Sequence, residues 1–184
     1  PAEFFAQPFR LLFSQVGFAW FGGLLAGLLT LLLLARHYRL PALQILDAAS
    51  PAAALGYGIG RLGCLISGDG DYGIATTLPW GMAFPNGLVP TSDRVHPTPL
   101  YEFLVAVALF YFLWRLGARA LRAHRPDGLV FANFLLWTGM ARFLVEFIRI
   151  NPPWLLGLTN AQVASLFSVA ASVALLLRLR AART

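Results

Sequence analysis

One long apolar run constrains the fold of this 184-residue chain more than any other feature. Residues Leu11 to Ala35 include no charged side chain. About 20 such residues in an α-helix cross the ~30 Å hydrocarbon layer of a membrane, so this run is long enough to span it. Composition agrees, because 58% of the residues are hydrophobic and only 12% are charged, with a mean hydropathy of +0.68. The sequence therefore predicts an integral membrane protein.

Further apolar segments predict four more membrane-spanning helices. The five predicted spans, in a single transmembrane domain of residues 1–184, cover residues 11–35, 42–66, 97–114, 128–150 and 160–177. Glycine, proline and aspartate are concentrated in residues 67–95, which predicts an outer loop of irregular structure or a short hairpin around Trp80–Phe84. Pro51 predicts a kink in the second helix. We expect an all-α membrane protein of about five transmembrane helices.

Arginine placement predicts the orientation. Arginine supplies all 14 basic side chains, since the chain has no lysine, and the net charge is +6. Three clusters follow the first, third and fifth spans: Arg36 and Arg39; Arg115, Arg119, Arg122 and Arg125; Arg178, Arg180 and Arg183. Five alternating crossings put these clusters on one side, which the positive-inside rule makes cytoplasmic. The loop over 67–95 then faces outward, away from the cytoplasm, and no nucleic-acid partner is expected.

Four charged residues interrupt the predicted spans near their outer ends. They are Arg61, Glu102, Arg142 and Glu146. At 1.5 Å per residue, they lie within roughly 6–12 Å of the outer surface. A charge inside a membrane costs at least ~2.5–3.5 kcal/mol on insertion scales, so a function for it is expected. Because a guanidinium donates two hydrogen bonds to phosphate, the pattern favours a site for an anionic phospholipid headgroup. Alternatively, the Arg142–Glu146 pair only holds helices together.

Several other polar residues have a simpler structural interpretation. We interpret Arg149 as an anchor whose side chain reaches the membrane interface. Asp69 and Asp71 fit turn chemistry in a glycine-rich loop. The single cysteine, Cys64, is interpreted as a packing residue, and His96 as either a helix-entrance residue or an acid–base group. The three histidines lack ligand spacing, so neither a metal nor another cofactor is expected.

Three sequence boxes carry the charged residues of the predicted spans. They are Gly60-Arg61-Leu62-Gly63 with the stretch Gly68–Gly73, then His96-Pro97-Thr98-Pro99-Leu100-Tyr101-Glu102, then Gly139–Arg149. In order and spacing they resemble the prolipoprotein diacylglyceryl transferases, whose box His-Pro-(Ser/Thr)-x-Leu-Tyr-Glu is matched residue for residue. The resemblance implies a multi-pass enzyme of the bacterial inner membrane with its active site near the periplasmic leaflet. Such an enzyme transfers diacylglyceryl from phosphatidylglycerol to the lipobox cysteine of a prolipoprotein signal peptide and releases glycerol 1-phosphate.

The resemblance also implies roles for individual residues. The implied catalytic residues are Arg61, Arg142, Glu102, Glu146 and His96. The implied substrate-binding residues are Arg61, Gly22, Gly23, Asp69, Gly73 and Tyr101. Arginines that neutralise charge on the leaving phosphate would lower the barrier. The acceptor thiol must lose a proton, and the sequence does not choose between a carboxylate and His96 as its acceptor.

The chain departs from the family pattern at several positions. Phe21-Gly22-Gly23-Leu24 stands where the family often has His-Gly-Gly-Leu, so a proposed catalytic histidine is absent. The chain also begins where the family's N-terminal helices should already have passed, which predicts a truncated member of a divergent branch or a shortened relative. The alternative function is a non-catalytic phospholipid-binding membrane scaffold protein. A small transporter or channel is a third possibility, which the uncharged inner halves of three spans disfavour.

Overall fold

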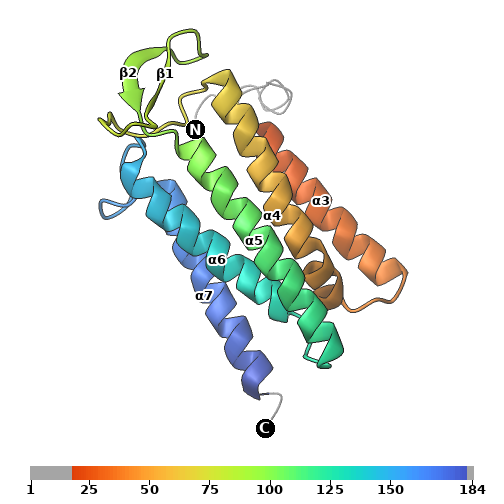
Figure 1. Cartoon of the computed structure of the whole chain (residues 1–184). Helices are drawn as coiled ribbons and strands as arrows, with labels where there is room; N and C mark the ends of the chain where they lie inside the picture. The colour runs from red at the N-terminus through yellow and green to blue at the C-terminus, as the bar shows by residue number, and fades with distance from the viewer. Residues whose placement is uncertain (1–17, 182–184) are drawn as a thin grey trace, which may run out of the picture. The chain divides into compact units, whose positions relative to one another are not determined.

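The computed structural model describes residues 18–181, most of which are helical (Figure 1). The chain divides into two compact units, Pro1–Ile45 and Leu46–Thr184, and each is described by itself. In the first unit, α3 (Phe18–His37) is a continuous helix with Arg36 and His37 in its last turn. The first part of the predicted span over 11–35 therefore lies outside the described residues.

Four α-helices form most of the second unit. They are α4 (Ala42–Ser67), which begins in the first unit, α5 (Thr98–Arg122), α6 (Leu129–Val145) and α7 (Asn160–Ala181), with the 3-10 helix η1 (Glu146–Ile148) directly after α6. Within the described residues, three helical segments are long and apolar enough to cross a membrane: Thr98–Arg122, Leu129–Ile148 and Asn160–Ala181. The α5 helix runs to Arg122 instead of ending at Trp114, because alanine, leucine and arginine in this segment all favour helix.

A small apolar core joins α4, α5 and α6. Its buried members are Ala54, Leu109, Leu113 and Val130. Close approach of α4 and α5 depends on Gly58, where an added Cβ would lie only 2.8 Å from the Ala106 Cβ. Small residues allow membrane helices to pack closely, so this contact brings together the helices that carry Arg61 and Glu102.

Hydroxyl groups hold α7 against α6. The Ser172 hydroxyl donates to the Ala132 carbonyl at 2.6 Å, and the Ser168 hydroxyl donates to the Leu135 carbonyl at 2.9 Å. Gly139 faces α7 so closely that a Cβ there would lie 3.0 Å from the Ser165 carbonyl oxygen. Lipid tails are as apolar as a helix surface, so the hydrophobic effect does not drive membrane helices together. Interhelical hydrogen bonds and small residues at the contact hold them instead.

The start of α6 is tied to α4 by one carboxylate. Asp47 accepts hydrogen bonds from the backbone N–H of Gly128 at 2.8 Å and of Phe131 at 2.7 Å. N–H groups at the start of a helix have no partner within the helix, so Asp47 supplies the acceptor that they lack. A carboxylate at this end also complements the helix dipole. The contact fixes where α6 begins relative to α4.

The loop between α4 and α5 contains the only sheet among the described residues. Strands β1 (Met82–Phe84) and β2 (Thr91–Val95) pair antiparallel, with Met82 opposite Val95. The hairpin predicted around Trp80–Phe84 therefore exists, with its second strand leading into α5. At the start of the loop, Gly68 adopts a left-handed φ of +58°, which turns the chain away from α4 at little cost.

Candidate active site

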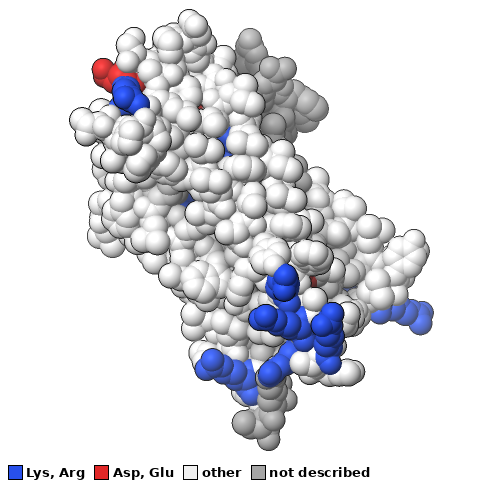
Figure 2. All heavy atoms as spheres, viewed as in Figure 1, with Lys and Arg blue, Asp and Glu red and all other residues white. Residues whose placement is uncertain are grey.

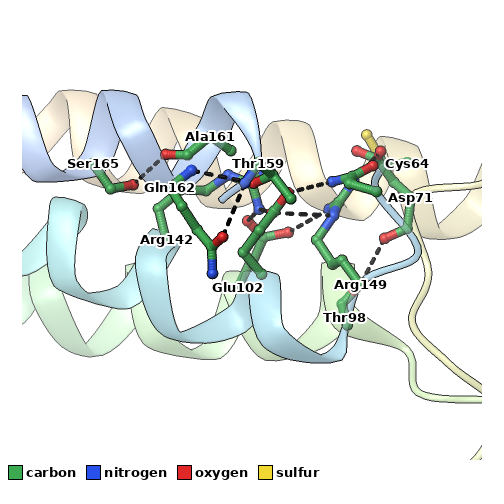
Figure 3. Close-up of polar contacts among 12 residues, drawn as sticks. Cys64, Asp71, Thr98, Glu102, Arg142, Arg149, Thr159, Ala161, Gln162 and Ser165 are labelled. Carbon is green, nitrogen blue, oxygen red and sulfur yellow. Dashed lines mark hydrogen bonds and ion pairs between the residues drawn. The ribbon is translucent and has the colours of Figure 1, made fainter. Parts of the chain in front are cut away.

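Six charged side chains meet where α4 ends, α5 begins and α6 ends, helices that Figure 1 labels. Figure 3 labels Asp71, Glu102, Arg142 and Arg149 among them. They are Arg61, Asp71, Glu102, Arg142, Glu146 and Arg149, and they are called the charged site below. Two backbone hydrogen bonds hold the loop over them: Ile74 N–H donates to the Ile148 carbonyl at 2.9 Å, and His96 N–H donates to the Ile74 carbonyl at 3.1 Å. The first bond fixes the loop to η1, and the second joins two parts of the loop itself. The Thr98 hydroxyl of α5 donates to the Asp71 carbonyl at 2.5 Å, which fixes the loop to α5 as well.

Glu102 lies at the centre of the charged site. Its Oε2 is 3.4 Å from Arg61 Nε and 3.3 Å from Arg149 Nη1, and its Oε1 is 3.6 Å from Arg142 Nη1. The Tyr57 hydroxyl donates to the same Oε1 at 2.5 Å. Arg61 and Arg142, which come from different helices, thus share one carboxylate partner.

Arg149 is buried, so its interpretation as an interfacial anchor is wrong. Its side chain is only 4% exposed and contacts Asp71 and Glu102, with its Nε 3.8 Å from Glu146 Oε2. The cause is local: the α-helical hydrogen bonding of α6 ends at Val145, η1 follows, and Arg149 itself is extended. Its backbone forms a bridge with Gly73 of the loop, which places the side chain among the carboxylates rather than at the surface.

Asp71 joins two arginines across the loop. Its carboxylate accepts from Arg61 and from Arg149, and its backbone carbonyl accepts from the Thr98 hydroxyl at 2.5 Å. Burial favours a raised pKa for Asp71, but the positive charges of Arg149 and Arg61 outweigh it and lower the pKa below its ordinary 3.8. Asp69 has the predicted turn role, since its Oδ1 accepts from the Asp71 N–H at 3.1 Å. Turn chemistry alone does not describe Asp71.

Arg142 and Glu146 form the other side of the charged site. Arg142 Nη1 lies 2.8 Å from Glu146 Oε2, and the Asn151 side-chain amide donates to Glu146 Oε1 at 2.6 Å. The Arg142 side chain is 24% exposed, against 16% for Arg61 and 4% for Arg149. Among the described residues, the ion pairs of Arg142 all involve its Nη1. Its Nε and Nη2 can therefore donate to a further acceptor.

The charges of this site balance, because three guanidinium groups face three carboxylates. Buried charges are tolerated when they are paired and hydrogen-bonded, and removing one partner leaves another uncompensated. Three buried polar atoms lie within ion-pair distance but lack a partner with hydrogen-bond geometry: Arg142 Nη1, Glu146 Oε2 and Arg149 Nε. Every charge of the site therefore has an opposite charge nearby, but the hydrogen bonding around Arg142 and Glu146 is incomplete.

His96 and Tyr101 form a second polar group beside the loop. The Tyr101 hydroxyl accepts from Trp80 Nε1 at 2.8 Å and lies 3.2 Å from His96 Nδ1. Since Trp80 can only donate, the Tyr101 hydroxyl can direct its own proton to His96 Nδ1, which favours the tautomer with the proton on Nε2. Gly73 N–H donates to the His96 carbonyl at 2.8 Å, and a Cβ at Gly73 would lie 2.5 Å from the Ile148 carbonyl oxygen. His96 and Tyr101 take part in none of the ion pairs above.

Two further predictions concern Gly22, Gly23 and metal binding. Gly22 and Gly23 belong to α3 in the first unit, so their role in substrate binding stays a prediction. In the second unit, Cys64, Asp69 and Asp71 bring possible ligand atoms within 4.8 Å of one another. Arg61 lies 4.0 Å from the Cys64 sulfur and pairs with Asp71, so a guanidinium already supplies the positive charge that a metal would bring. These residues do not fit a cation site.

Two contributors to the charged site carry no role in the sequence interpretation. Tyr57 lies one helical turn before Arg61, and its hydroxyl accepts from Arg61 Nε at 3.0 Å while donating to Glu102. Its spacing of four residues from an intramembrane arginine is the signal that could have identified it. Asn151 follows the end of η1, where its amide gives no comparable signal.

The fold and the site define a class of protein: a helical membrane protein with a buried arginine–carboxylate site where three of its helices meet a loop. Residues 3–178 match the family model described as prolipoprotein diacylglyceryl transferase. The chain belongs to this family, which confirms the resemblance seen in the sequence boxes.

Curated relatives named phosphatidylglycerol–prolipoprotein diacylglyceryl transferase agree with this assignment. The Leptospira interrogans relative is 38% identical over 161 residues, which cover 82% of this chain and 50% of the relative. The Methylobacillus flagellatus relative is 39% identical over 180 residues, which cover 95% of this chain and 66% of the relative. The Geobacter sulfurreducens relative is 42% identical over 144 residues, which cover 77% and 52%. The chain thus spans about half to two thirds of the length of these relatives.

Proposed function

We propose that this chain carries the diacylglyceryl transfer activity named in its relatives. In this proposal, phosphatidylglycerol donates its diacylglyceryl group to the lipobox cysteine thiol of a prolipoprotein signal peptide, and glycerol 1-phosphate leaves. The single observation that carries the proposal is that Arg61 and Arg142, from separate helices, converge on Glu102. Two guanidinium groups at one place in an apolar protein are suited to one phosphodiester.

The proposed setting is the bacterial cytoplasmic membrane, crossed five times by a single transmembrane domain. Arginine side chains gather around the C-terminal ends of α5 and α7, on the face that Figure 2 shows. The charged site lies at the opposite ends of α5 and α6, since Glu102 begins the one and Arg142 ends the other. Under the positive-inside rule, the arginine-rich end is cytoplasmic and the charged site faces the periplasmic leaflet.

The three arginines have different proposed roles, which follow from their exposure. Arg142 is the most exposed and has unused donors, so it contacts the phosphate first, and Arg61 supports it from α4. Arg149 is buried and holds Asp71 and Glu102 in place, so it is a positioning residue. These two carboxylates then orient Arg61 through its Nη1 and Nε. Preorganised charge of this kind stabilises a transition state without reorganisation during the reaction.

The proposed reaction is a displacement at carbon. The acceptor sulfur forms a bond to a glycerol carbon of the diacylglyceryl group, and the bond from that carbon to the phosphate oxygen breaks. Arg142 and Arg61 stabilise the negative charge that builds up on the leaving phosphate. His96 accepts the thiol proton in this scheme at Nδ1, once the Tyr101 hydroxyl turns its own proton away from that nitrogen. Glu102 is less suited to this role, because Tyr57 and three arginines already hold its carboxylate.

A transfer assay tests the proposed function. The protein is incubated with phosphatidylglycerol labelled in its acyl chains and with a peptide that contains a lipobox cysteine. We expect label on the peptide, and a loss of roughly 10²-fold or more for Arg142→Lys, since a single preorganised donor is worth about that much. The matched control is Arg119→Lys, an exposed arginine of α5, which should keep full activity. No label with intact protein that still retains phosphatidylglycerol would support the scaffold alternative instead.

A further inference from the structure

A cavity of about 300 Å³ lies far along the helices from the charged site, where the α5–α6 connection meets the end of α7. Its lining residues are Arg125, Pro126, Leu129, Asn133, Leu176, Leu179 and Arg180. Arg125 precedes α6 and Arg180 lies in the last turn of α7, so two separate segments bring their guanidinium groups to one opening. This cavity is called the basic pocket below.

The basic pocket has uncompensated positive charge. No aspartate or glutamate lines it. Every ion pair formed by the described residues involves Arg61, Arg142 or Arg149 and belongs to the charged site. Arg125 and Arg180 are both exposed, and neither has a carboxylate partner among the residues that the structure describes. Their charge is complementary to an anion, and the field of neighbouring arginines on α5 and α7 adds to the attraction.

Apart from Asn133, the rest of the lining is apolar, and it extends along the helices away from the two arginines. Leu176 lies one helical turn inside Arg180, and Leu129 starts α6 directly after the segment that carries Arg125. The Asn133 amide, one further turn inside, is satisfied by the Leu129 carbonyl at 2.8 Å. The pocket therefore has a charged entrance and an apolar wall that continues toward the middle of the helices. A ligand that fits both parts is an amphiphile with an anionic head.

We propose that the basic pocket binds an anionic phospholipid from the leaflet at this end of the helices, with its phosphate between Arg125 and Arg180 and the start of an acyl chain against Leu129 and Leu176. This site is separate from the charged site and does not depend on the proposed transfer reaction. A bound lipid would join the α5–α6 connection to the end of α7, since residues of both segments line the cavity.

The test uses native mass spectrometry of the full chain in a neutral detergent, with long-chain phosphatidic acid as the probe. The cavity variant is Arg125→Gln with Arg180→Gln, and the matched control is Arg119→Gln with Arg178→Gln, which removes the same charge outside the cavity. We expect the cavity variant to bind phosphatidic acid roughly tenfold to thirtyfold more weakly, and the control to stay within about threefold of the unchanged chain. The charged site is the same in both variants, so the difference between them reports on the basic pocket alone.

A second variant keeps both arginines and fills the cavity. Leu176→Trp should weaken lipid binding about as much as the double arginine variant, and it supplies the answer if that variant does not fold. Equal losses in the cavity and control variants would overturn the proposal in favour of diffuse surface charge. Inorganic phosphate that displaces phosphatidic acid at equal concentration would overturn it in favour of a soluble anion. Unchanged binding by Leu176→Trp would also contradict the pocket.

Discussion

The two ends of the helix bundle use arginine in opposite ways. At the charged site, three arginines are largely buried, and each contacts at least two carboxylates. At the other end, arginines of α5, its following turn and α7 are exposed and none forms an ion pair with a described residue: Arg115, Arg119, Arg122, Arg125, Arg178 and Arg180. The same residue type is therefore paired with carboxylates among the packed helices at one end and forms unpaired surface charge at the other.

This difference shows why position within an apolar segment is more informative than charge alone. An arginine in the last turn of a membrane helix reaches water or headgroups without any partner. An arginine held inside the packed helices requires compensation, and that compensation organises neighbouring residues around it. Variants at the two ends should consequently differ in their effects on stability, and four predictions test this.

The largest expected effect is that of Arg149→Gln. Its loss leaves Asp71, Glu102 and Glu146 with too little positive charge in a buried place, so the free energy of unfolding should fall by ~3–5 kcal/mol. Arg122→Gln, an exposed arginine in the last turn of α5, should change it by less than ~0.5 kcal/mol. Denaturant-induced unfolding in mixed micelles measures both. Equal effects of the two variants would contradict the contrast between the two ends.

A smaller loss is expected when the helices that carry the charged site are forced apart. Gly58→Ala places a Cβ 2.8 Å from the Ala106 Cβ, and overpacking of this kind costs ~1–3 kcal/mol. Gly56→Ala in the same helix is the control, because its Cβ would meet nothing within 4 Å. There the higher helix propensity of alanine should stabilise the chain by up to ~1 kcal/mol. The same unfolding experiment should give opposite signs for the two variants, and a shared sign would argue against close α4–α5 packing.

Acid should weaken the charged site through Asp71. The pKa of Asp71 in the folded chain is below its ordinary 3.8, so the folded state binds fewer protons than the unfolded state in this range. The stabilisation is therefore complete above pH 3.8 and is lost as the pH falls through the lower, folded-state pKa. Unfolding measured from pH 6 down to about pH 2 should show this loss, and Asp71→Asn should remove that part of the pH dependence. An Asp71→Asn profile parallel to that of the unchanged chain would refute the assignment.

The smallest expected effect lies between the two ends, where no charge is involved. Ser172→Ala removes the hydrogen bond from α7 to the Ala132 carbonyl and should destabilise by about 0.6 kcal/mol, the average for such bonds in membranes. Ser165→Ala is a suitable comparison, since the Ser165 hydroxyl bonds only within its own helix, to the Ala161 carbonyl. Its effect on unfolding should be smaller still. A Ser172→Ala loss as large as that of Arg149→Gln would show that helix packing, not charge pairing, dominates this fold.

Much of the helical fold could be predicted because apolar runs and arginine clusters mark where membrane helices lie and end. The predicted ranges 97–114, 128–150 and 160–177 are helical for most of their length. The predicted end at Trp114 differs from the structure because that prediction follows the first charge, Arg115, whereas a charged residue does not end a helix and α5 continues to Arg122. The close approach at Gly58 could not be predicted, since it depends on which helix faces which.

The charged site could be predicted only in part. Arg61, Glu102, Arg142 and Glu146 could be selected because each places a charge within an apolar segment. Arg149 lies at a helix end, where sequence cannot distinguish an exposed anchor from a residue that the chain turns inward. The role of Asp71 depends on the backbone hydrogen bond of the loop to η1 and on the hydrogen bond from the Thr98 hydroxyl of α5, which link residues far apart in the sequence.

One measurement tests the central claim most directly, namely that Arg61 and Arg142 act on one phosphate. It is a double-mutant cycle on kcat/KM for phosphatidylglycerol with Arg61→Lys, Arg142→Lys and both together. If the two guanidinium groups hold the same phosphate, the double variant should lose much less than the product of the single losses, with a coupling energy of at least about 1 kcal/mol. Losses that multiply fully would contradict a shared phosphate and the proposed active site with it.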